Sequence, residues 1–164
     1  MLGRRMKIRA ATDDDDDALW EIVEPILRAG ETYSLPREWS RADALGFWRA
    51  PLAEAFVAED DGLIGTYTLR PNALGGGGHV ANAGYMTAGR ARGRGVAGAM
   101  CEHSIERARQ RGFRAMQFNS VVATNEGAIR LWQRHGFAIV GRVPGGFLHP
   151  AAGLVDLLVM HRAL

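Results

Sequence analysis

The chain has little cysteine and lacks long apolar segments, and each absence narrows the class of protein. Cys101 is the single cysteine among 164 residues, so no disulfide framework can form, and this usage is typical of a reducing, cytoplasmic compartment. No segment approaches the roughly 18 consecutive apolar residues that a membrane-spanning helix requires, so no membrane partner is expected. The segment MLGRRMKIRA at the start is basic, but no apolar run follows it, so we expect no signal peptide.

A large excess of one charge is also missing. The 20 basic and 18 acidic residues leave a formal net charge of only +2, which argues against a nucleic-acid partner. The five histidines show no spacing typical of metal ligands, and His103 and Cys101 would face different sides of a helix, so no metal is expected. Residues 1–164, with an ordinary apolar content of 47%, are predicted to form one domain.

The periodicity of apolar residues predicts an α/β domain on a mixed sheet. Strands are predicted at residues 6–10, 55–59, 63–70, 79–86, 115–122, 137–141 and 153–160. Helices are predicted from Thr12, over 40–48, after the turn 90–95 to about Arg111, and from 124–125 to Gly136. Pro25 is expected to kink or restart the first helix, and residues 144–150 are expected to form a loop. Strands 79–86 and 115–122 flank a helix, so they are predicted to be parallel neighbours.

Residues 82–108 form the stretch around which the rest of the chain is organised. A strand leads into the turn Arg90-Ala91-Arg92-Gly93-Arg94-Gly95, and a helix follows at once. The free N–H groups and the dipole of a helix N-terminus favour an anion. Arginines beside those amides are typical of phosphate sites, so the turn predicts a phosphorylated ligand.

Gly93, Gly95 and Gly98 also match the GxGxxG pattern of dinucleotide-binding proteins. In that class an acidic residue that binds a ribose lies about 20 residues further on. The following strand here offers Phe118 and Asn119 instead, and the unit lies in mid-chain after three strands. We therefore discount a nicotinamide cofactor.

Two spaced motifs resemble those of the GNAT family of N-acetyltransferases. The first is Arg90-x-x-Gly93-x-Gly95, and the second is Asn125-x-x-Ala128-x-x-Leu131-Trp132-x-x-x-Gly136-Phe137. The resemblance implies a GNAT-type mixed sheet of about six to seven strands, about four helices and splayed central parallel strands. It also implies acetyl-CoA as co-substrate and suggests a homodimer. A further similarity, to acetyltransferases of proline analogues and related amino acids, rests on residues 82–86, 118–119 and 125.

The resemblance implies which residues hold the cofactor. Glycines in the turn let the backbone approach phosphates without a Cβ. Pantetheine would lie between the splayed strands and pair with the backbone near Met86. The implied cofactor-binding residues are Tyr85, Met86, Thr87, Arg90, Arg92, Gly93, Arg94, Gly95, Val96, Ala97, Asn125, Ala128 and Trp132.

The acceptor and proton-transfer residues are less well specified by the sequence. In the family, the position of Trp132 is usually a tyrosine that protonates the leaving thiolate. Water or another residue must then protonate it here, and Tyr85 and Tyr33 are the candidate residues. Strand 79–86 carries no carboxylate, so we consider deprotonation through water, an amine that arrives neutral, or Glu31 as base. The candidate catalytic residues are therefore Asn125, Asn82, Tyr85 and Glu31, and the candidate substrate-binding residues are Asn82, Asn119, Ser120 and Tyr33.

These observations predict direct transfer of an acetyl group to the primary or secondary amine of a small molecule, an amino acid or an analogue. Cys101 is expected on the buried face of its helix, so no covalent enzyme intermediate is predicted. One alternative is acetylation of a protein N-terminus or lysine. Another, from a different class, is a CoA-binding sensor without turnover, which the missing tyrosine at position 132 keeps open.

Overall fold

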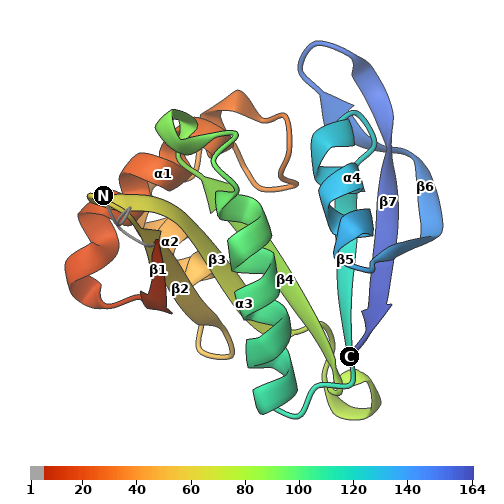
Figure 1. Cartoon of the computed structure of the whole chain (residues 1–164). Coiled ribbons are helices and arrows are strands. Elements are labelled where there is room, and N and C mark those ends of the chain that lie inside the picture. The colour runs from red at the N-terminus through yellow and green to blue at the C-terminus, as the bar shows by residue number, and fades with distance from the viewer. Residues whose placement is uncertain (1–5) are drawn as a thin grey trace.

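Residues 6–164, the part of the chain that the computed structural model describes, are built around a seven-stranded mixed sheet (Figure 1). The strands are β1 (Lys7–Ala10), β2 (Glu54–Glu59), β3 (Leu63–Pro71), β4 (Val80–Thr87), β5 (Ala115–Val122), β6 (Ala138–His149) and β7 (Gly153–Ala163). The α-helices of this part are α1 (Asp16–Ala29), α2 (Arg41–Trp48), α3 (Val96–Gln110) and α4 (Glu126–Arg134).

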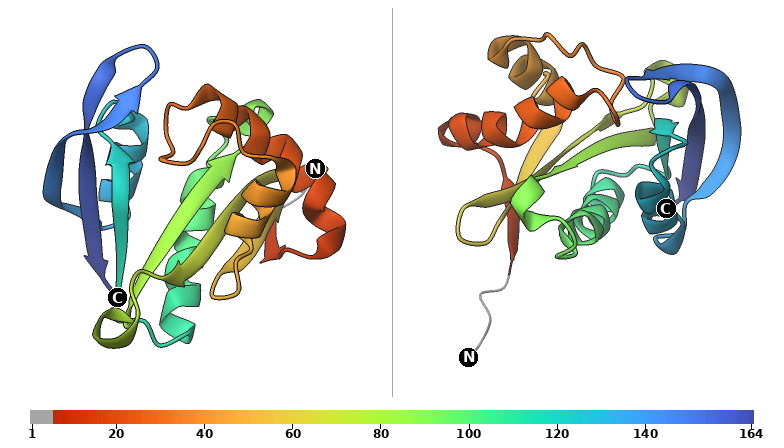
Figure 2. Two further views of the ribbon diagram at one scale, coloured as in Figure 1. Left: turned by 180° about the vertical axis from the view of Figure 1, so that it is seen from behind. Right: turned by 90° about the horizontal axis from the view of Figure 1, so that it is seen from above.

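The sheet has the strand order β1-β2-β3-β4-β5-β7-β6. Strands β1 to β4 are antiparallel neighbours, β4 and β5 are parallel, and β5, β7 and β6 are again antiparallel. Helices α1 and α2 cover one face, and α3 and α4 cover the other (Figure 2). The architecture confirms the predicted mixed-sheet α/β fold. None of the helices within residues 6–164 is long and apolar enough to cross a membrane.

The alternation of side chains along β3 separates the two layers. Tyr67 is fully buried in the core that α3 covers. Its neighbours Thr66 and Thr68 face α2, where Thr66 Oγ1 accepts a hydrogen bond of 2.9 Å from Trp48 Nε1. Thr68 Oγ1 donates to the carbonyl of Trp48 at 2.9 Å. By the same alternation, the side chain of Arg70 lies on the α2 side of the sheet.

The parallel strands β4 and β5 pair over only a short distance. Their register joins Val80 to Ala115 and Ala81 to Met116, after which the two strands diverge. Strand β5 also shifts register against β7 between Phe118 and Val121, which is the signature of a β-bulge. The prediction of splayed central strands is therefore confirmed, and the divergence opens a gap beside the C-terminal end of β4.

One local prediction was wrong. Residues 144–150 do not form a loop, because β6 runs to His149 with a register shift between Val143 and Phe147. An edge strand with a bulge tolerates a proline, since the missing N–H of Pro144 need not pair within the sheet.

Of the two outcomes predicted for Pro25, a kink or a restart, the restart does not occur, because helix α1 continues through Pro25 to Ala29. An interior proline costs about 3 kcal/mol or more, because it removes one helical hydrogen bond and its ring crowds the preceding turn. The buried side chains Ile22, Val23 and Leu27 flank Pro25 on both sides. Each contributes about 1.5–3 kcal/mol on burial, which offsets the penalty.

Candidate active site

The N-terminus of α3 presents a group of backbone amides without acceptors. Gly93 and Gly95 adopt left-handed conformations, with φ of 76° and 78°. A Cβ atom at either position would meet no atom of the described chain within 4 Å, so the turn faces open space. Within residues 6–164, the N–H groups of Gly93, Gly95, Val96, Ala97 and Gly98 have no hydrogen-bond acceptor. This cluster of free donors fits an anion and supports the prediction of a phosphate site.

The three arginines of the turn have different surroundings. Arg90 Nη2 donates to the carbonyl of Leu63 at 2.7 Å, and Arg94 Nη2 pairs with Asp60 Oδ2 at 2.6 Å. Both bonds tie the turn to the hairpin formed by β2 and β3. Arg92 is exposed and has no partner in the described part of the chain, so its guanidinium is available to an anion. The N–H groups of Arg92 and Arg94 are themselves used in turn bonds.

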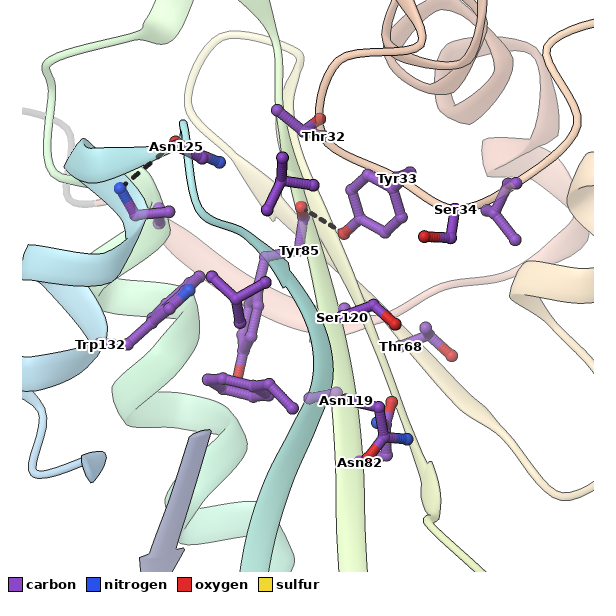
Figure 3. Close-up of a pocket in the computed structure, with 18 of the residues that line it drawn as sticks. Thr32, Tyr33, Ser34, Thr68, Asn82, Tyr85, Asn119, Ser120, Asn125 and Trp132 are labelled. Carbon is purple, nitrogen blue, oxygen red and sulfur yellow. Dashed lines mark hydrogen bonds between the residues drawn. The ribbon is translucent and has the colours of Figure 1, made fainter. Parts of the chain in front are cut away.

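A pocket of about 470 Å³ occupies the gap between β4 and β5 (Figure 3). One wall comes from the loop between α1 and α2, and the opposite wall comes from β5 and α4. Ala97 of α3 connects the pocket to the turn with the free amides. The lining residues are Thr32, Tyr33, Ser34, Leu35, Phe47, Trp48, Thr68, Arg70, Asn82, Ala83, Gly84, Tyr85, Thr87, Ala97, Phe118, Asn119, Ser120, Val121, Val122, Asn125, Gly127, Ala128, Leu131 and Trp132.

Tyr33 anchors the loop wall to β4 (Figure 3). Its hydroxyl donates a hydrogen bond of 2.6 Å to the carbonyl of Tyr85. Its ring packs edge-on against Trp48, with 6.2 Å between the centroids. A Cβ atom on Gly84 would stand 3.2 Å from the Tyr33 hydroxyl, so any larger residue there would require the tyrosine to shift by a few tenths of an ångström. Burial raises the pKa of the Tyr33 phenol, which therefore stays protonated at neutral pH.

A network of side-chain amides closes the base of the gap. Asn82 Nδ2 donates to the carbonyl of Gln117 at 3.1 Å and thereby bridges β4 and β5 just beyond their last backbone pair. Asn72 Oδ1 accepts from Asn82 Nδ2 at 3.3 Å and from Asn119 Nδ2 at 2.7 Å. Gln117 Nε2 donates to Asn119 Oδ1 at 2.9 Å. The structure thus brings together Asn82 and Asn119, two of the predicted substrate-binding residues, and it adds Asn72, which the sequence analysis did not name.

The backbone of β4 turns its alternate amides toward the gap. The carbonyl of His79 accepts a bond from Arg114 on the β5 side, whereas the carbonyl of Val80 accepts from Asn72 on the β3 side. Because these directions alternate along a strand, the N–H groups of Tyr85 and Thr87 point into the gap. The amide of Met86 faces β3, and its side chain is buried in the core under α1 and α2. Met86 is therefore not among the lining residues, although its neighbours are.

The phenol of Tyr85 points away from the gap and into the core. Its hydroxyl lies 2.6 Å from Ser104 Oγ on α3 and 3.8 Å from the sulfur of Met116. Burial raises the pKa of this phenol well above its ordinary value. Burial also raises the pKa of the Cys101 thiol to about 12, which suits a structural cysteine rather than a nucleophile.

Trp132 stands between the core and the pocket (Figure 3). Its ring centroid lies 4.8 Å from that of Tyr85 and 5.2 Å from that of Phe118. The indole Nε1 has no protein partner in residues 6–164. Since no buried side-chain nitrogen in this part of the chain lacks a hydrogen-bond partner, Nε1 is accessible to solvent. The indole N–H therefore retains access to the pocket, where it can donate a hydrogen bond.

Asn125 caps α4, as its position before the helix predicts. Its Oδ1 accepts from the N–H of Ala128 at 3.4 Å, and its Nδ2 remains available at the rim of the pocket (Figure 3). Ser120 lies in the bulge of β5 and also lines the pocket. Glu31 is exposed and is not a lining residue, although Thr32 beside it is.

Thr68, Arg70 and Phe47 are lining residues that sequence reasoning missed. The period-two alternation of Thr66, Thr68 and Arg70 was a usable signal, because it places polar side chains on one face of a strand next to the site. Among residues 6–164, no three His, Cys, Asp or Glu side chains gather as metal ligands.

The comparisons with known proteins agree with this arrangement of sheet, turn and pocket. Residues 17–137 match the acetyltransferase (GNAT) family, so the chain belongs to that family of N-acetyltransferases. A GCN5-related N-acetyltransferase from Kribbella flavida is 44% identical, with a TM-score of 0.92 over 97% of this chain and 98% of that one. The N-acetyltransferase aca1 of Schizosaccharomyces pombe is 28% identical, over 81% of this chain and 72% of that protein.

The same fold occurs in a phosphinothricin acetyltransferase from Sinorhizobium meliloti in complex with acetyl-CoA. The two chains are 20% identical with a TM-score of 0.86, over 98% of this chain and 89% of the other.

Proposed function

We propose that this enzyme transfers the acetyl group of acetyl-CoA directly to the amine of a small molecule, an amino acid or a close analogue. The observation that carries the proposal is the continuity of the site. Free amides at the N-terminus of α3 open onto one end of a gap, and the side-chain amides of Asn82 and Asn119 line the pocket at the other end.

The residues present fit an acyl-CoA donor. The amides of Gly93 to Gly98 without acceptors, together with Arg92, suit a pyrophosphate. The gap between β4 and β5 leaves the N–H groups of Tyr85 and Thr87 without a strand partner, so they can bind an extended amide-containing arm. When bound, acetyl-CoA supplies a thioester carbonyl as electrophile.

The chain's own groups then position and polarise the reactants. A backbone N–H of β4 can donate to an oxygen that becomes more negative during the reaction. In the reaction a C–N bond forms and a C–S bond breaks, while the amine loses one proton and the departing thiolate gains one. The indole N–H of Trp132 can stabilise that thiolate by a hydrogen bond but cannot protonate it, so water delivers the proton.

The size of the pocket supports a small acceptor. Its volume of about 470 Å³ must hold both the end of the donor and the amine. This is near the lower end of the roughly 300–1,000 Å³ typical of small-molecule sites. A lysine within a protein would instead require an open groove.

Release of free thiol, detected with DTNB across a panel of amines, tests the proposal. Turnover with free amino acids but not with peptides is the expected result. Turnover with peptides alone would transfer the assignment to protein acetylation. Binding of acetyl-CoA without turnover of any amine would make the chain a sensor.

We further propose a cytoplasmic homodimer that forms through β6 and β7. Strand β6 is an edge strand, and apolar side chains are exposed on it and on β7, namely Ile139, Val140, Val143, Leu148 and Leu154. Exposed edges and clustered apolar side chains favour association. Light scattering should show a dimer that Val140→Asp converts to a monomer. A monomeric unsubstituted chain at micromolar concentration would contradict this proposal.

A further inference from the structure

Arg70 lies at the acceptor end of the pocket. In the register of β3 and β4 it stands directly opposite Asn82. Side chains at such paired positions share one face of the sheet, with Cβ atoms about 4.5–5.5 Å apart. Arg70 therefore borders the amide network at the base of the gap and lies on the same face as Thr68.

The guanidinium is held in place by one of its nitrogens. Arg70 Nη2 donates to the carbonyl of Phe47 at 2.9 Å and approaches Thr68 Oγ1 at 3.4 Å. The guanidinium carbon also stands 4.4 Å from the centroid of the Phe47 ring. Nε and Nη1 have no partner in residues 6–164. A guanidinium carries five N–H donors, so a fixed cation with spare donors is left at the pocket.

Arg70 also lacks a counter-ion. In the described part of the chain, no carboxylate lies within 4.0 Å of its guanidinium, and none of the other lining residues carries a formal charge. Two other partly exposed arginines each meet a carboxylate, Arg9 with Asp15 at 2.8 Å and Arg107 with Glu54 at 2.8 Å, whereas Arg162, like Arg70, donates to a backbone carbonyl. Burial disfavours the charged form of Arg70 and lowers its pKa from the ordinary value.

We propose that Arg70 binds the carboxylate of the acceptor and so restricts the substrates to amines that carry a carboxylate near the nitrogen. The inference rests on the proposed function and deepens it. A plain ammonium compound would bring a second positive charge into a pocket that already holds one, whereas an amino acid brings the missing anion. The nitrogen can then lie toward Asn82, whose Oδ1 is not engaged by the described residues.

The test compares matched acceptors on the full-length enzyme. Thiol release is measured with free amino acids and with the amides of the same amino acids, for the unsubstituted chain, Arg70→Gln and Arg70→Lys. Arg109→Gln, an exposed arginine on α3, is the control. Charge-assisted hydrogen bonds contribute about 1.5–3 kcal/mol, so Arg70→Gln should lower kcat/KM for free amino acids roughly 10- to 100-fold.

The expected signature is specific for the carboxylate. Arg70→Gln should change kcat/KM for the amides less than about threefold, Arg70→Lys should restore part of the preference, and Arg109→Gln should change neither. The inference is overturned if the unsubstituted enzyme uses acids and amides equally. It is also overturned if Arg70→Gln lowers both alike while thermal melting and acetyl-CoA affinity stay normal. Absence of turnover with every amine, despite acetyl-CoA binding, would instead refute the proposed function.

Discussion

Replacing Tyr33 by phenylalanine tests how the acceptor wall is held. The variant keeps the ring against Trp48 but removes the hydroxyl that bonds the Tyr85 carbonyl at 2.6 Å. An acceptor left unpaired in a buried site costs about 1–3 kcal/mol. A loss near 1.5 kcal/mol corresponds to a fall in Tm of about 3–6 °C for a domain of this size.

Tyr67→Phe is a matched control, because it removes a hydroxyl that meets His103 Nδ1 at 2.7 Å on the other face of the sheet. Both variants should melt earlier, but only Tyr33→Phe should raise KM for the amine, since only that loop lines the pocket. Thermal melts and steady-state kinetics measure the two effects. An unchanged Tm, or equal changes in KM for both variants, would refute the anchoring role. A selective fall in kcat would identify Tyr33 as a proton donor instead.

Four further changes have defined outcomes. Trp132→Phe should lower kcat about 10-fold or more through loss of the indole N–H, and unchanged kcat would reduce Trp132 to a packing role. Gly95→Ala should raise KM for acetyl-CoA, because alanine at a φ of 78° is strained by about 1–2 kcal/mol and the turn that presents the free amides would have to adjust; an unchanged KM would contradict this. The value of kcat/KM for the acceptor amine should rise with pH and level off above the pKa of the substrate's own ammonium group, because no lining residue of the described chain is a carboxylate or histidine. Glu31→Gln should leave that profile unchanged, and an inflection at one pH for all amines would indicate an enzymic base. Hydrogen bonds from Arg9 lower the pKa of Asp15 to about 2, so its stabilisation is full above about pH 4 and is lost as the pH falls toward 2. Asp15→Asn should therefore lower Tm at pH 7 much more than at pH 2. Equal falls in Tm at the two pH values would show that the ion pair between Arg9 and Asp15 does not stabilise the fold.

Most of the fold followed from local patterns. Strand β5 and helix α2 were predicted almost to the residue, because an apolar run marks the strand and Pro51 limits the end of the helix. The loop predicted at 144–150 failed because proline and glycine were read as breakers. An edge strand with a bulge accommodates them, and only the pairing with β7 reveals that edge.

The candidate active site also has one part that local sequence predicted and one part that it did not. The phosphate turn was predictable, because the conformations of Gly93 and Gly95 and the start of α3 depend on contiguous residues. The acceptor end was predictable only in part. Asn82 and Asn119 were named, but the roles of Asn72 and Arg70 depend on how β3 lies beside β4.

The sequence by itself therefore determined the family, the anion turn and the cap of α4, since each is a local arrangement of backbone and neighbouring side chains. The tertiary structure decided where the Tyr85 phenol points, which of the turn's arginines is left for a ligand, and that Arg70 has no carboxylate beside it. The physical reason is that a charge or hydroxyl acquires its environment from segments far apart in the chain. The balance of partners around it exists only once β3, β4, β5 and the loop of Tyr33 have come together.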